Sequence, residues 1–276
     1  MTTAPRPQLQ RSAVLPALVL GIAVVAWIGT VAFHTYSHTA PPVPQSPLAP
    51  HHAASHLAVA GQAESGIGGA GGVGNWMLGW TLMVVAMMLP PALPLVRAID
   101  RLTAGLADRP ALIAWVVAVF LTVWVAAGLA LYSAGTGLHS ALALLPAWAN
   151  RAGLFAGVAA IAAGLFQVTP LKMACMDACR SPTSVIMTHW QAATPRRSAA
   201  RIGMVYGAIC VGCCWALMLL SVLVGALMLP IMVVTAALMM LERLLPSVRP
   251  LIPLQAGLAI AIGALLIAGV VPPGFP

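Results

Sequence analysis

The residues best suited to chemistry are five cysteines, which fall into two groups along the chain. Cys175 and Cys179 are four residues apart, and the second group consists of Cys210, Cys213 and Cys214. Residues three or four apart share one face of a helix, so each group would present thiols together. Thiolates collected on neighbouring helices are typical of a soft-metal site, with copper as Cu(I) favoured and zinc as the alternative.

The cysteine spacing leaves two other interpretations open. A pair of thiols could cycle to a disulfide in redox chemistry. The cysteines could also be packing residues, because cysteine is small and apolar enough to fill the interior of a membrane helix bundle. A structural disulfide framework is disfavoured, since the number of cysteines is odd and the nearer compartment is the reducing cytoplasm.

Three methionines are further candidate ligands, because thioethers suit Cu(I). Met83 and Met87 are four residues apart, and Met218 follows Cys214 by four residues. The alternative for these methionines is flexible apolar packing. A proline-rich segment that begins at Pro90 follows the first two methionines and would kink or break their helix.

Histidines are concentrated in residues 34–75, a stretch rich in proline and glycine that we expect to be a flexible loop. Neutral imidazoles in such a loop can capture divalent copper, nickel or zinc as an auxiliary site. The alternative is a polar spacer without a metal role. The stretch contains five of the seven histidines: His34, His38, His51, His52 and His56.

The composition is that of a membrane protein. The chain has 276 residues, of which 61% are hydrophobic and 7% charged, whereas soluble domains have about 25% charged residues. This excludes a soluble globular protein, a disulfide-rich secreted module and a nucleic-acid-binding protein. Phosphate-binding loops and nucleophile elbows are absent from the sequence. None of the five acidic residues falls in the middle of a predicted span, so we expect no enzymatic activity.

Apolar runs of roughly 17–25 residues predict an all-α, polytopic transmembrane bundle of six to seven spans. The sixth run is short and begins near Pro230, so that it is tilted, re-entrant or joined to the fifth. The predicted spans cover residues 13–33, 76–96, 111–133, 152–171, 202–224, 226–241 and 251–271.

The distribution of positive charge predicts the orientation. With the N-terminus inside and seven spans, 12 of the 13 basic residues face the cytoplasm and only Arg151 lies outside. Basic loops stay cytoplasmic, so we expect a multi-pass protein of the plasma membrane, surrounded by the lipid bilayer. The chain then divides into a cytoplasmic tail (1–12), a first helix (13–33), an extracytoplasmic loop (34–75), a cysteine-containing membrane domain (76–245) and a last helix with its tail (246–276).

Several segments resemble a bacterial family of uncharacterised proteins, labelled predicted metal-binding integral membrane proteins (domain of unknown function 2182). The resemblance covers roughly residues 76–245 and implies metal binding in the inner membrane. Its most specific part is the Cys210-Val211-Gly212-Cys213-Cys214-Trp215 run beside Cys179-Arg180-Ser181-Pro182. The other matching residues are Trp80 to Pro90, Pro94, Gln167 to Lys172, Cys175, His189-Trp190, Tyr206-Gly207, Ala216 to Met218 and Glu242.

The two cysteine groups are expected to converge. Pro170 would end the fourth span, and a short helix after it would carry Cys175 and Cys179. This helix must fold back into the bundle as a re-entrant element to reach the fifth span, which is tolerated where backbone is buried in protein. Lys172 and Arg180 would then help to offset the negative charge of the thiolates.

These expectations favour a membrane protein that binds a soft metal through its cysteines and handles, stores or delivers it. A membrane or periplasmic metalloprotein would be its partner. The alternatives are a thiol redox protein, or a non-catalytic subunit or assembly factor of a larger membrane complex.

Overall fold

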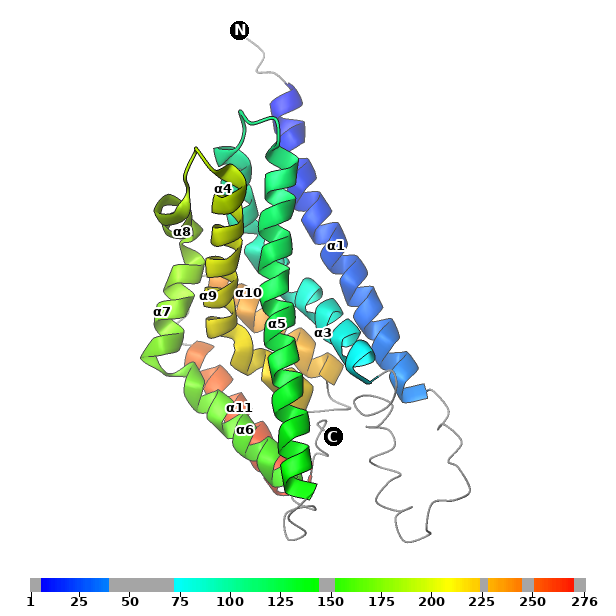
Figure 1. The fold of residues 1–276 in the computed structure, drawn as a ribbon. Coiled ribbons are helices and arrows are strands. Elements are labelled where there is room, and N and C mark those ends of the chain that lie inside the picture. Colours follow the sequence, from blue (N-terminus) through cyan, green and yellow to red (C-terminus); the bar gives the residue numbers. More distant parts are fainter. Residues whose placement is uncertain (1–5, 40–71, 144–151, 224–227, 245–250, 271–276) are drawn as a thin grey trace. The chain divides into compact units, whose positions relative to one another are not determined.

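A computed structural model describes residues 6–39, 72–143, 152–223, 228–244 and 251–270, and all elements in these ranges are helices (Figure 1). This confirms the all-α prediction. The elements are α1 (Arg6–Thr39), α3 (Gly72–Met88), the 3-10 turn η1 (Pro90–Ala92), α4 (Leu93–Leu102), α5 (Arg109–Ala143), α6 (Ala152–Gln167), α7 (Pro170–Arg180), α8 (Pro182–His189), α9 (Pro195–Leu223), α10 (Met228–Leu244) and α11 (Leu251–Ile267).

Three of these helices are long and apolar enough to cross a membrane, in Val14–Thr35, Arg109–Leu138 and Pro195–Leu223. Two bent pairs raise the number to five if each pair is one span: α3 with η1 and α4, bent by 47°, and α6 with α7, bent by 63°. Among the described residues the candidate spans therefore number three to five, fewer than the six to seven predicted. The difference arises because the apolar parts of α10 and α11 are shorter than the about 20 residues that a span needs.

Prolines mark both bends. Pro90 follows the end of α3, and Pro170 is the first residue of α7, three residues after Gln167, where α6 ends. Proline lacks an N–H group and clashes with the preceding turn, whereas it is well accommodated in the first turn of a new helix. The predicted break after the methionines of α3 is confirmed. The fourth predicted span, 152–171, ends at Gln167 instead.

The first helix is longer than predicted. It extends to Thr39, six residues beyond the expected end of the first span, so His34 and His38 belong to α1 and not to a loop. His51, His52 and His56 lie outside the described residues.

The chain packs as two compact units. The first consists of Met1–Thr30, Thr81–Val125 and Met173–Cys213, and the second of Val31–Trp80, Ala126–Lys172 and Cys214–Pro276. Helices α7 and α9 each contribute residues to both units.

Close contact between α5 and α9 organises the first unit. A Cβ atom placed on Gly203 would lie 2.6 Å from the carbonyl oxygen of Val116, and one on Gly207 would lie 3.0 Å from Val123. Small residues four apart allow two helix backbones to approach in this way. The rings of Phe120 and Tyr206 pack between the same helices, with centroids 6.1 Å apart.

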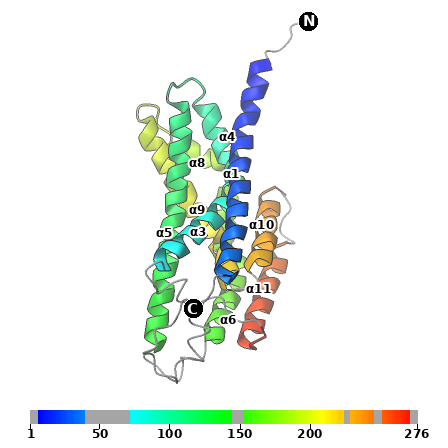
Figure 2. The ribbon, with the colours of Figure 1, turned by 90° about the vertical axis from the view of Figure 1, so that its right-hand side faces the viewer.

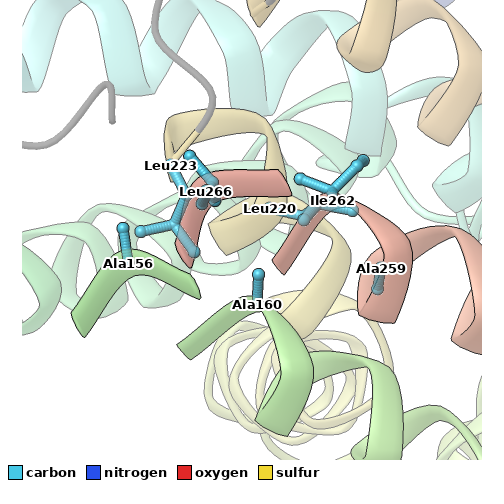
Figure 3. Packing of buried hydrophobic residues seen from close by; sticks show 7 residues of the cluster. All are labelled: Ala156, Ala160, Leu220, Leu223, Ala259, Ile262 and Leu266. Carbon is cyan, nitrogen blue, oxygen red and sulfur yellow. The ribbon is translucent and has the colours of Figure 1, made fainter. Parts of the chain in front are cut away.

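The second unit is built on an equally close pair, α6 and α11, which run side by side in Figures 1 and 2. A Cβ on Gly157 would lie 2.5 Å from the carbonyl oxygen of Gly263, and one on Gly263 would lie 2.6 Å from that of Gly157. Leucines from α9 complete the apolar core around this pair. Figure 3 shows its members: Ala156, Ala160, Leu220, Leu223, Ala259, Ile262 and Leu266.

Candidate metal centre

Three cysteine sulfurs from two helices of the first unit lie together. Cys179 of α7 and Cys210 and Cys213 of α9 have their Sγ atoms within 4.8 Å of one another. The Sγ atoms of Cys179 and Cys213 are 3.5 Å apart, well beyond a disulfide bond length of about 2.05 Å. The three side chains are 3%, 1% and 4% exposed, and all are free thiols. The three residues are called the cysteine triad below.

Helical spacing places two members of the triad on the same face of α9. Cys210 and Cys213 are three residues apart and therefore share a face of this helix. The Cys213 thiol donates a hydrogen bond to the carbonyl oxygen of Cys210, at 3.2 Å. This bond holds the Cys213 sulfur close to its own helix, near Cys179.

Tyr206 ties the third member to α9. Its hydroxyl group donates a hydrogen bond to the carbonyl oxygen of Cys179 at 3.0 Å, and its side chain is fully buried. Cys179 lies in the last turn of α7, where carbonyl oxygens have no partner within the helix. Tyr206 therefore satisfies one of these carbonyls and fixes the end of α7 against the helix that carries the other two thiols.

The donor set fits a soft cation. Three sulfurs each about 2.3 Å from one coplanar ion would be about 4.0 Å apart. The triad, within 4.8 Å and with its closest pair at 3.5 Å, matches this size after shifts of well under 1 Å. Thiolate sulfur selects Cu(I) or zinc over hard cations. Structural zinc sites have four protein ligands, so a group of three favours Cu(I).

The other two cysteines lie outside this group. Cys175, one turn before Cys179 on α7, is half-buried, and its Sγ lies 3.0 Å from the position that a Cβ on Gly212 would occupy. Cys214 is buried and belongs to the second unit. Of the five cysteines expected to converge, the structure brings three within ligand distance. Metal binding by any of the five stays a prediction.

The candidate methionine ligands are all buried. Met83 and Met87 lie on α3, and Met218 lies on α9 one turn beyond Cys214. Burial agrees with either ligation or packing, so their predicted role is not decided by their position.

A buried polar cluster in the second unit was not foreseen. The side chain of Lys172, in the first turn of α7, is completely buried and forms an ion pair with Glu242 of α10, with Nζ and Oε1 2.8 Å apart. The ammonium group also donates to the side-chain oxygens of Gln167 and of Gln255, the latter at 3.1 Å. All three protons of the ammonium group thereby find acceptors.

This cluster corrects one expectation. Lys172 was expected to help balance the charge of the cysteine thiolates, but its charge is matched by Glu242. Glu242, just beyond the end of the sixth predicted span, is 4% exposed. A buried ion needs a partner of opposite charge. The signal that could have indicated the pair is that Lys172 and Glu242 each directly follow a predicted span, 152–171 and 226–241 respectively.

Tyr206 and Gly212 also received no role from the sequence alone. Tyr206 precedes Cys210 by four residues and so shares its helix face, which was the available signal. Gly212 lies within the cysteine run itself. Its importance depends on the approach of α7, which the sequence of α9 does not contain.

Comparison with known proteins adds one match. The family model PpoB2, described as copper chaperone, matches residues 77–267. This supports a metal-related family, as the sequence resemblance implied, although under a different name. No curated protein and no solved structure matches the chain.

Proposed function

Because the chain belongs to the PpoB2 copper chaperone family, we propose that it binds Cu(I) through the cysteine triad and delivers it to another protein. The observation that carries the proposal is the mutual approach of three buried sulfurs from α7 and α9 to within 4.8 Å. Copper is here the cargo, held by ligands that can be exchanged. Zinc is the alternative ion, because it also accepts thiolate ligands.

The triad is suited to holding copper in the reduced state. Burial of Cys179, Cys210 and Cys213 keeps water and hard ligands from the ion, and soft sulfur donors favour Cu(I). Each thiol must lose its proton to become a ligand, so metal binding releases protons. Binding therefore also breaks the hydrogen bond from the Cys213 thiol to the Cys210 carbonyl.

The proposal places the protein in a bacterial inner membrane, with a cytoplasmic N-terminus and seven passes. Its support is the set of apolar helices together with the positions of the arginines. Lys172 is paired within the protein and does not mark a loop. The remaining twelve basic residues are arginines, and eleven of them face the cytoplasm in this topology. In it, α10 and α11 cross the bilayer as short spans.

The proposed role is non-enzymatic. A membrane or periplasmic metalloprotein would accept the copper, and nucleic acid is not a partner. His51, His52 and His56, together with His34 and His38 at the end of α1, would add weak capture of divalent metal, separately from the triad. The weakness follows from composition, because ordering ligands on a proline- and glycine-rich segment has an entropic cost.

One distance favours a second candidate function. The Sγ atoms of Cys179 and Cys213, 3.5 Å apart, are close enough to form a disulfide after a shift of about 1.5 Å. Such a redox protein would pass two electrons and two protons per disulfide to an oxidant. Counting free thiols in denatured, metal-free protein before and after mild oxidation identifies this candidate, since a disulfide removes two thiols and Cu(I) binding oxidises none.

Metal analysis of purified protein tests the proposed function. Wild-type protein, prepared without oxygen and exposed to excess Cu(I), should retain one tightly bound copper ion per chain. Single replacements Cys179→Ser, Cys210→Ser and Cys213→Ser should each abolish tight binding, and Cys214→Ser, adjacent in the chain, serves as the matched control. Retention of copper by the three triad variants would contradict the proposal. Preferential retention of zinc would assign the site to the alternative ion.

A further inference from the structure

The fourth cysteine of the first unit differs from the triad in exposure. Cys175 is half-buried, whereas Cys179, Cys210 and Cys213 are buried. Cys175 precedes Cys179 by four residues, so both thiols lie on one face of α7, about 6 Å apart along its axis. Asp177, two residues from each of these cysteines and on another side of α7, is exposed.

A glycine makes room for the Cys175 thiol. A Cβ on Gly212 would lie 3.0 Å from the Cys175 Sγ. Cβ atoms of other residues rarely approach a neighbouring atom this closely. The missing side chain therefore lets Cys175 rest against the backbone of α9. Gly212 directly precedes Cys213 in the chain, so the half-buried thiol lies beside the segment that carries the triad.

Burial creates a kinetic difficulty for the triad. Metal–thiolate bonds are about 2.3 Å long, so a donor protein must bring its own ligand to that distance from the ion before the ion can be transferred. The triad sulfurs, with side chains 4% exposed or less, are not accessible to a ligand of another protein. Transfer then requires an intermediate ligand that contacts both the outside and the triad.

We propose that Cys175 is this exchange ligand, through which Cu(I) enters and leaves the cysteine triad; the inference rests on the proposed function. In loading, a bond forms between the Cys175 sulfur and Cu(I) as one bond from the donor thiolate to copper breaks. The proton of the Cys175 thiol passes to the released donor thiolate. The three triad thiols then bind the ion and displace Cys175 and the remaining donor thiolate. Of the three protons that the triad releases, Cys175 takes up one, the donor thiolate takes up another, and the third passes to water. Copper remains Cu(I) throughout, so no oxidant or reductant is needed.

Exchange kinetics with a Cu(I) chelator distinguish this role from ordinary ligation. Bathocuproine disulfonate, a chelator whose Cu(I) complex is coloured, is mixed with the copper-loaded full-length protein in detergent, and copper release is followed by stopped flow. Cys175→Ser should bind one copper ion with unchanged equilibrium affinity. Its loading and release should both be slower by about tenfold or more, equivalent to about 1.4 kcal/mol in the barrier.

Gly212→Ala tests the same step without removing a thiol. Its new Cβ would push the Cys175 sulfur away from α9, so both rates should again fall while stoichiometry is kept. Gly207→Ala is the matched control, because it adds the same methyl group on the same helix at 3.0 Å from Val123. It should leave the rates unchanged. Circular dichroism shows whether each variant is folded.

Two results would overturn the inference. Weaker affinity with faster release in Cys175→Ser would make Cys175 an ordinary fourth ligand, and unchanged rates would give it no role in transfer. In both cases the wild-type protein still binds copper, so the proposed function stands. Failure of the wild-type protein to bind Cu(I) would instead refute the proposed function itself.

Discussion

The sulfur atoms of Cys179 and Cys213 lie 3.5 Å apart, although 34 positions of sequence separate the two residues. The contact joins the end of α7 to the middle of α9, and Cys210 completes a group of three sulfurs around it. The turn of the chain at Pro170, which bends α7 by 63° from α6, gives α7 a direction of its own.

The hydrogen bond from Tyr206 to the Cys179 carbonyl should support the site. Tyr206→Phe leaves a buried carbonyl without this donor, at a cost of about 1–3 kcal/mol in the free energy of unfolding. Because Tyr206 positions a ligand residue, Cu(I) affinity should fall by roughly 10-fold or more, as for other outer-shell residues of metal sites. Chelator competition measures the affinity. Tyr132→Phe, on α5 in the second unit, should leave it unchanged; equal losses in both variants would refute the role of Tyr206.

The buried ion pair should be a major determinant of stability. Lys172→Met leaves the Glu242 carboxylate buried without its counter-charge, which should destabilise the protein by about 3–5 kcal/mol. Thermal unfolding in detergent measures the loss. The double variant Lys172→Met, Glu242→Leu should recover much of the stability, because no buried charge remains. Asp108→Asn, which breaks an exposed pair with Arg196, should cost less than about 1 kcal/mol. A double variant less stable than Lys172→Met would contradict this account.

Adding a side-chain atom where α6 contacts α11 should destabilise the protein. In Gly157→Ala the new Cβ would lie 2.5 Å from the carbonyl oxygen of Gly263, so the helices must separate. Overpacking of this kind typically costs about 1–3 kcal/mol. Gly257 on α11 has no atom within 4 Å of such a Cβ, and Gly257→Ala should be neutral or stabilise the protein by roughly 0.4–1 kcal/mol. Thermal unfolding of both variants provides the comparison, and similar melting temperatures would refute the close approach.

The sequence predicted much of the helical architecture and part of the cysteine geometry, for physical reasons. Each of the seven predicted spans coincides with helix in the structure. The i, i+3 spacing of Cys210 and Cys213 correctly placed two thiols on one face of α9. The described helices give three to five candidate spans where six to seven were predicted, because hydropathy does not distinguish a bent or short apolar helix from a complete crossing. The partner of Lys172 was missed since Glu242 is 70 positions away, and local periodicity carries no information about such contacts.

The proposed orientation predicts which residues are reached from outside the cell. In a Cys-free background, a cysteine introduced at Ser55 should react with a membrane-impermeant maleimide in intact spheroplasts. A cysteine introduced at Arg196, in the first turn of α9, should react only after the membrane is opened. The asymmetry follows from the retention of basic loops in the cytoplasm. Labelling at position 196 but not at 55 would reverse the topology.

X-ray absorption at the copper edge of the Cu(I)-loaded protein shows which atoms bind the ion. If the cysteine triad is the site, copper has a first shell of three sulfur atoms at about 2.3 Å, the length of metal–thiolate bonds. That shell should be unchanged in Cys214→Ser, and the bound copper should be lost from the variant with Cys179, Cys210 and Cys213 all replaced by serine. A first shell of nitrogen or oxygen atoms, or a full sulfur shell in the triple variant, would contradict the assignment of these three cysteines as the copper site.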